Sequence, residues 1–104
     1  MRKKYETKLE EKEEKRTIYI GKKELLITFY HNPNVVGPRS EHTGLPIWVG
    51  ETTAKGSLNG GTLIETVANC WVKEPYSYTR ARVVSAGRLL KQLKLPTELA
   101  EQMK

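Results

Sequence analysis

The chain has 104 residues and a formal net charge of +6, from 18 Lys and Arg against 12 acidic residues, all of them Glu. This length suits one domain and not two, and no apolar run approaches the roughly 18 residues of a membrane-spanning helix. A single cysteine excludes an internal disulfide framework and a multi-cysteine zinc site. No apolar secretion signal follows the first residues, so we expect a cytoplasmic protein.

The first 16 residues are densely charged, with seven basic and five acidic side chains. A helix there would set several like charges four residues apart, and after Met1 only Tyr5 and Leu9 are apolar. We therefore predict a charged N-terminal arm over 1–16, solvated or forming a frayed strand, followed by a single domain over 17–104. An arm that contacts a partner in an oligomer is the alternative.

The middle of the chain is rich in strand patterns. Residues 17–30 predict a β-hairpin with its turn at 21–23, and both faces of 24–30 are largely apolar, which favours a place inside a sheet or at an interface. Beyond the hairpin we predict a loop over 31–46, a short strand around 47–49, a second loop over 50–61 and a strong strand over 62–72. Cys70 is expected to be a core residue of that last strand.

A helical pattern follows Pro75. Over 80–93, apolar residues recur at three- and four-residue spacing, at Val83, Ala86, Leu90 and Leu93. Ser77 or Thr79 is a suitable N-cap, Pro96 ends the helix, and 97–104 predicts a short second helix. The order of elements predicts an α+β fold, with a small antiparallel β-sheet followed by one or two C-terminal helices.

Most of the excess positive charge lies in residues 73–94, which hold six basic residues and only Glu74 as an acid. Such a concentration indicates an electropositive site. Arg80 and Arg88 lie two helical turns apart on the face opposite the apolar stripe, where their guanidinium groups can hold two phosphates or one diphosphate. Gly87 costs the helix about 1 kcal/mol relative to Ala, which indicates close approach of another helix or of a ligand.

Two aromatic residues, Tyr76 and Tyr78, precede and begin this helix. Free N–H groups at a helix N-terminus favour anions, and aromatic rings beside arginines stack bases. We predict a nucleotide-binding site formed by Tyr76, Tyr78, Arg80, Arg82, Gly87 and Arg88, in which Tyr76 and Arg88 are primary. The alternative is that the two tyrosines cap the core.

The sequence favours a protein without catalytic activity. His31 and His42 have no zinc-ligand spacing, and neither a nucleophile elbow nor a P-loop occurs. The absence of Asp removes the usual magnesium ligand. We therefore predict no enzyme activity, no metal site and no cofactor.

Residues 62–94 carry a family resemblance. From Cys70 to Leu90, a strand ending in Cys is followed by Lys-Glu-Pro-Tyr, a basic cluster and a helix with Gly-Arg-Leu. This pattern resembles the first Thoeris anti-defence type, small phage-encoded sponges for cyclic ADP-ribose. Tyr76 matches the family's stacking aromatic and Gly87-Arg88 its closing Gly-Arg, whereas Glu74 replaces an expected Asp and Ala81 a common glycine.

The resemblance implies a non-catalytic homo-oligomer in the host cell cytoplasm. It would sequester a cyclic nucleotide immune signal, either a cyclic ADP-ribose isomer or a cyclic oligonucleotide, and so block anti-phage defence. Two alternatives remain open: a basic nucleic-acid-binding protein, suggested by the charge, and a phage inhibitor that binds a host protein. We expect no membrane partner, and we expect oligomerisation through residues 25–30 or the Gly87 face, because the core is small.

Overall fold

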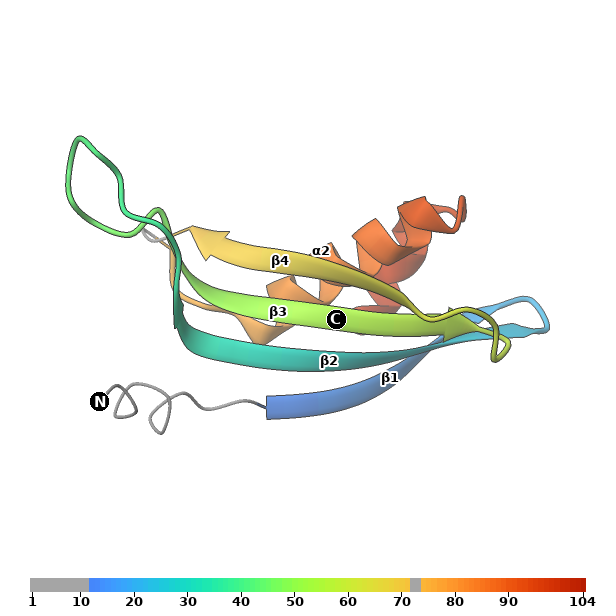
Figure 1. The fold of residues 1–104 in the computed structure, drawn as a ribbon. Helices are drawn as coiled ribbons and strands as arrows, with labels where there is room; N and C mark the ends of the chain where they lie inside the picture. The colour runs from blue at the N-terminus through green and yellow to red at the C-terminus, as the bar shows by residue number, and fades with distance from the viewer. Residues whose placement is uncertain (1–11, 72–73) are drawn as a thin grey trace.

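The computed structural model of the chain describes residues 12–71 and 74–104. Four strands form one antiparallel sheet in the order β1-β2-β3-β4, and two helices follow on one face of it (Figure 1). The elements are β1 (Lys12–Ile20), β2 (Lys23–Val36), β3 (Trp48–Leu58), β4 (Ile64–Trp71), the α-helix α2 (Tyr78–Gln92) and the 3₁₀ helix η1 (Thr97–Met103). The predicted α+β class is confirmed. Among the described residues, no helix is long and apolar enough to cross a membrane.

Strand β1 begins inside the segment predicted as a charged arm. Lys12 pairs with His31, and the register continues without a break to Ile20 and Lys23. The predicted boundary at residue 16 therefore falls within the strand, and the rest of the predicted arm, 1–11, lies outside the described residues. The charges are compatible with a strand because β1 is at the edge of the sheet, where side chains and one row of backbone groups face water.

Strand β3 occupies most of the stretch predicted as a loop over 50–61, so that prediction is wrong. Its buried residues are all small, namely Gly50, Thr52, Ala54 and Gly56. A Cβ on Gly56 would lie 3.1 Å from Cδ1 of Leu89, so α2 packs directly on this strand. The strand fits under the helix because its side chains are small, and for that reason the sequence lacks the apolar alternation that marks a strand.

The predicted loop over 31–46 is also too long. Strand β2 continues to Val36, with a shift of register against β3 between Asn32 and Val36. The connection to β3 is closed by an isolated bridge between Arg39 and Pro46 and projects beyond the end of the sheet (Figure 1).

The core lies between the sheet and the two helices. Helix α2 starts two residues earlier than predicted, with Ser77 as its N-cap accepting a hydrogen bond of 3.1 Å from the Arg80 backbone N–H. Ala86 and Leu90 of the predicted apolar stripe are buried, as is Leu89. The buried apolar residues that form one cluster are Ile18, Leu25, Ile27, Phe29, Ala54, Ala86, Leu89, Leu90, Ala100 and Met103. Ala68 of β4 is also buried.

Candidate functional site

The structure divides the six predicted site residues among three places. Tyr76, Tyr78 and Arg82 belong to a polar cluster between the sheet and α2. Arg80 and Arg88 lie on the exposed face of α2 beside β4. Gly87 faces η1, since a Cβ added to it would lie 4.0 Å from the Cβ of Ala100. That distance is an ordinary van der Waals contact, so η1 lies beside Gly87 but leaves room for a methyl group, and the predicted close approach is not what requires a glycine here.

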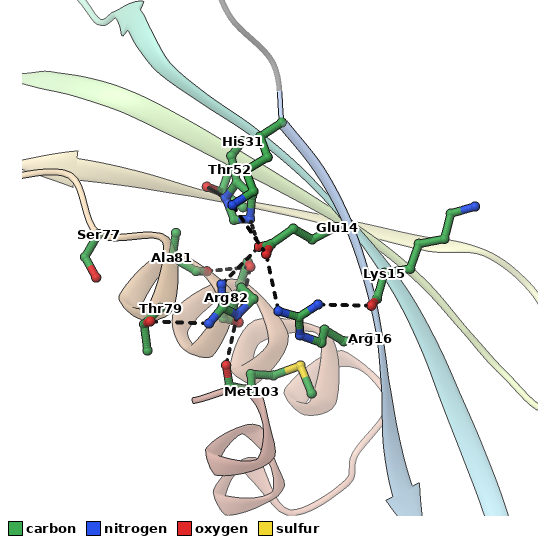
Figure 2. Close-up of polar contacts among 12 residues, drawn as sticks. Glu14, Lys15, Arg16, His31, Thr52, Ser77, Thr79, Ala81, Arg82 and Met103 are labelled. Atoms are coloured by element: carbon green, nitrogen blue, oxygen red, sulfur yellow. Dashed lines mark hydrogen bonds and ion pairs between the residues drawn. The ribbon is translucent and has the colours of Figure 1, made fainter.

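Glu14 is at the centre of the polar cluster (Figure 2). Its Oε1 accepts hydrogen bonds from Nε2 of His31 at 2.8 Å and from Nη1 of Arg82 at 3.0 Å, and only 11% of the Glu14 side chain is exposed. Arg82 also donates from Nε to the Met103 carbonyl at 2.9 Å and from Nη2 to Oγ1 of Thr79 at 3.3 Å. One carboxylate and one guanidinium thus connect β1, β2, α2 and η1.

A chain of hydrogen bonds continues from His31 to the loop before α2. Because a carboxylate only accepts, Nε2 of His31 carries the hydrogen, and Nδ1 of the neutral ring accepts from Oγ1 of Thr52 at 2.8 Å. The Thr52 hydroxyl in turn bonds the Tyr76 hydroxyl, which also lies 3.4 Å from the Glu51 carbonyl. The order of the chain is Tyr76, Thr52, His31, Glu14.

The ionisation of the cluster follows from its burial and its partners. Burial lowers the pKa of His31, although the Glu14 carboxylate opposes this, so the ring is neutral at pH 7. Burial raises the pKa of Glu14, but the hydrogen bonds from Arg82 and His31 more than offset it and hold that pKa below its usual value. Burial also raises the pKa of Tyr76. The cluster therefore contains one anion, Glu14, which pairs with the buried Arg82 and, through Oε2, with the more exposed Arg16 and Lys12.

This cluster has the residue types of a Glu–His–hydroxyl catalytic set, but it is closed to a substrate. His31 and Thr52 have no exposed surface, and Tyr76 lies over Gly50, whose backbone has φ of +100°. A Cβ at Gly50 would overlap the Tyr76 ring. The arrangement is what a structural polar core requires, since the buried side chains of His31, Thr52 and Arg82 each have hydrogen-bond partners.

The two tyrosine rings pack against this core. Tyr78 makes edge-to-face contacts with His31 at 4.9 Å and with Tyr76 at 5.3 Å between ring centroids. The ammonium group of Lys12 lies 4.6 Å from the Tyr78 ring centroid. The geometry agrees with the alternative in which the tyrosines cap the core. Arg82 is buried, whereas Tyr76 is half-buried and also lines the cleft beside Arg80.

Arg80 borders a small cleft between β4 and the start of α2. Its side chain is 67% exposed, and Nη1 lies 2.7 Å from Oε1 of Glu74. The cleft has a volume of about 60 Å³ and is lined by Ala68, Asn69, Cys70, Glu74, Tyr76, Ser77, Arg80, Ala81 and Val84. Cys70 is half-buried there, with Sγ 3.4 Å from the Glu74 carbonyl oxygen, and is not the core residue that the sequence predicts.

Arg88 lies further along the same face of α2. It is exposed and donates a hydrogen bond from Nη1 to the backbone carbonyl of Val67 in β4. A shallow depression beside it includes Lys91 and Glu65. We call the exposed strip between α2 and β4 the basic groove, and define it by Arg80, Val84, Arg88 and Lys91 of the helix and Val67 and Asn69 of the strand.

The basic groove keeps two of the predicted site residues together. Arg80 and Arg88 are eight residues apart in one helix, which separates their Cα atoms by about 12 Å along the axis. The first turn of α2 contains no acidic residue, so the N-terminal end of the helix dipole adds to the positive potential there. The groove can therefore bind a ligand with two anionic groups, or a short run of phosphates.

The sequence did not reveal the centre of the polar cluster. From the sequence, His31 is a candidate only for zinc binding and Glu14 falls in the predicted arm, yet the two side chains meet across 17 residues of sequence, and Glu14 meets Arg82 across 68. A local pattern could not indicate contacts at such separations. Among the described residues, no group of three or more His, Cys, Asp or Glu side chains could hold a metal ion.

Comparisons with known proteins give no relative: no family model matches the chain, and neither a curated protein nor a solved structure is similar to it. The resemblance of residues 62–94 to the first Thoeris anti-defence type stays a prediction.

Proposed function

We propose that this protein binds and sequesters a phosphate-bearing nucleotide signal without transforming it, and that the basic groove is its binding surface. The ligand class is a cyclic ADP-ribose isomer or a cyclic oligonucleotide, and its removal would keep a host defence effector inactive. This proposal keeps the ligand class that the sequence suggested. It replaces the predicted site by Arg80 and Arg88, with Lys91 as a third cation.

The observation that carries the proposal is the exposed pair Arg80 and Arg88 on one face of α2. Arginines that are not needed for packing and that border an open surface are suited to bidentate binding of phosphates. Arg80 is paired with Glu74, and both side chains are largely exposed, so a ligand phosphate can replace that carboxylate at little cost. A non-catalytic role is supported by the burial of the Glu14–His31–Thr52 array.

The size of the groove bears on how the ligand is held. Pockets for small ligands have volumes of about 300–1,000 Å³, whereas the cleft beside Arg80 measures about 60 Å³, and the depression beside Arg88 and Lys91, of about 690 Å³, is shallow and open to solvent. One chain therefore provides one wall of a site, and a second copy is needed to enclose the ligand. The homo-oligomer expected from the sequence is part of this proposal for that reason.

Calorimetry against cyclic ADP-ribose isomers and cyclic dinucleotides tests the proposal. Arg80→Ala and Arg88→Ala should each weaken binding about 10- to 150-fold, as expected for the loss of a charged hydrogen bond worth about 1.5–3 kcal/mol. Lys22→Ala removes a charge from the exposed β1–β2 turn, away from the groove, and is the matched control with an expected change of less than twofold.

The main competing function is nucleic-acid binding, which the line of Arg80, Arg88 and Lys91 along α2 also favours. Duplex binding through several phosphates weakens steeply as salt rises, whereas an enclosed nucleotide is much less sensitive. If none of the cyclic nucleotides binds the wild-type protein and short DNA binds with a steep salt dependence, the sequestration proposal is wrong and nucleic-acid binding replaces it.

A further inference from the structure

The two edges of the sheet differ in how they are protected. On β1, five of the nine residues are charged, and Glu14 points into the protein. In addition, the Gln102 side chain accepts from the Tyr19 backbone N–H at 3.1 Å and donates to the Tyr19 carbonyl at 3.2 Å. Charged residues, inward-pointing charges and covered backbone groups are the usual means of preventing an edge strand from pairing with another chain.

Strand β4 has fewer of these protections, although the Arg88 side chain covers one backbone group, the Val67 carbonyl. Its eight residues, IETVANCW, include a single charge, Glu65. Val67 and Trp71 are 37% and 57% exposed, and Leu63, just before the strand, is 62% exposed. These three residues lie four apart, so they share the face of the sheet that α2 does not cover. An open edge strand with β-forming residues and exposed apolar side chains is a template for strand pairing.

We propose that β4 pairs antiparallel with β4 of a second copy of this chain, about a two-fold axis at Val67. Opposite residues of an antiparallel pair lie on the same face, so a symmetric pair is centred on one residue. Centring on Val67 sets Val67 opposite its own copy, Glu65 opposite Asn69 and Leu63 opposite Trp71. All three exposed apolar residues gain an apolar neighbour, and the carboxylate meets an amide.

The symmetric registers centred on Glu65, Thr66 or Ala68 are poorer. Centring on Glu65 places two carboxylates opposite each other, which is destabilising. Centring on Thr66 sets Glu65 opposite Val67, and centring on Ala68 sets it opposite Trp71. In both registers the carboxylate of Glu65 lies against an apolar side chain. The self-complementarity of the Val67 register therefore favours a second copy over an unrelated partner strand.

The hydrogen bond from Arg88 agrees with this register. Backbone groups of successive residues in a strand point to alternate sides, and the Val67 carbonyl is reached by Arg88 from outside the sheet. Val67 therefore presents its carbonyl to the open edge, so that Val67 and its copy would form a hydrogen-bonded pair of the antiparallel ladder. The flexible Arg88 side chain occupies this carbonyl in the single chain and turns aside when the second strand pairs.

The position differs from those that the sequence suggested for self-association. Residues 25–30 lie in β2, which is hydrogen-bonded on both sides by β1 and β3, and Gly87 packs against η1. Neither offers an unpaired strand edge. Val67 and Asn69 also border the basic groove, so pairing at this edge would bring the grooves of the two copies together, but the inference itself rests on the strand edge and not on nucleotide binding.

Charge exchange at Val67 tests the register directly, by sedimentation of the full chain at 2–200 µM. The wild type should sediment at twice the 11.9 kDa of the chain. Val67→Lys and Val67→Glu should each weaken the dimer by about tenfold or more, because like charges then face each other, and an equimolar mixture of the two should restore it. Leu26→Lys, a 52% exposed position on the same face of the inner strand β2, is the matched control and should leave the dimer intact.

A cysteine cross-link provides a second measurement that holds even if a charged variant fails to fold. In a Cys70→Ser background, Val67→Cys should form an intermolecular disulfide, because opposite Cα atoms lie about 4.5–5.5 Å apart, within disulfide range. Leu26→Cys in the same background should not. A wild-type protein that stays monomeric at 200 µM, or a dimer that cross-links through Leu26→Cys and not through Val67→Cys, would overturn the inference.

Discussion

Replacing two neighbouring arginines of α2 by alanine should give very different losses of stability. Arg82 has a side chain that is 10% exposed, and it donates to a carboxylate, a backbone carbonyl and a hydroxyl. Removing it leaves Glu14, with a side chain only 11% exposed, without its main cationic partner. Breaking such a buried pair costs about 3–5 kcal/mol, because the remaining charge stays buried.

Arg80 is the control for the same helix and the same substitution. Its ion pair with Glu74 is as short as 2.7 Å, but the two side chains are 67% and 46% exposed. Exposed pairs of this kind contribute about 0–1 kcal/mol. Arg82→Ala and Arg80→Ala gain the same small amount of helix propensity, so the difference between them reports the burial of the Arg82 pair.

Urea unfolding followed by circular dichroism measures both changes. We expect Arg82→Ala to lose about 3–5 kcal/mol of unfolding free energy, equivalent to a fall in Tm of about 12 °C or more for a domain of this size, and Arg80→Ala to lose less than about 1 kcal/mol. Equal losses in the two variants, or a loss below about 1 kcal/mol for Arg82→Ala, would show that the polar cluster is not a structural element and would return Arg82 to the candidate ligand-binding residues.

Three further predictions concern the same region. Gly50→Ala should cost about 2–5 kcal/mol of stability in thermal unfolding, because the new side chain is strained at positive φ and overlaps the Tyr76 ring. Gly60 also has a positive φ, of +74°, but no atom lies within 4 Å of an added Cβ, so Gly60→Ala should cost only about 1–2 kcal/mol. Equal costs for the two variants would contradict the close packing of Tyr76 on Gly50. Tyr76→Phe should cost about 1 kcal/mol of stability by the same assay and leave nucleotide affinity in calorimetry unchanged, since its hydroxyl is bonded inside the protein; a large loss of affinity would contradict this. Because folding lowers the pKa of His31 below 6.5 and that of Glu14 below 4.5, the unfolded chain binds more protons, and stability in urea should fall as the pH drops below 6.5 and further below 4.5. His31→Gln should remove the upper part of this dependence, and a wild-type stability that is constant between pH 7 and 5 would refute the reasoning.

The sequence by itself determined the parts of the fold that depend on local patterns. Helix α2 has an apolar stripe at helical spacing and a serine cap, so its ends could be predicted within a few residues. The first hairpin has alternating β-formers around a glycine turn, so its turn could be predicted, but its outer ends could not. The basic character of α2 was equally local, because Arg80, Arg88 and Lys91 repeat at helical spacing on its exposed face.

The tertiary structure alone decided which of the basic and aromatic residues face the interior. Arg80 and Arg82 are two positions apart in the helix. Only Arg82 has a structural role, because it alone bonds Glu14 and the Met103 carbonyl, which come from opposite ends of the chain. Strand β3 was not predicted because its inward-facing residues are small, as the close packing of α2 requires, and small residues do not produce the apolar alternation of a strand. Contacts between segments distant in sequence set these outcomes, and no local pattern of residues carries that information.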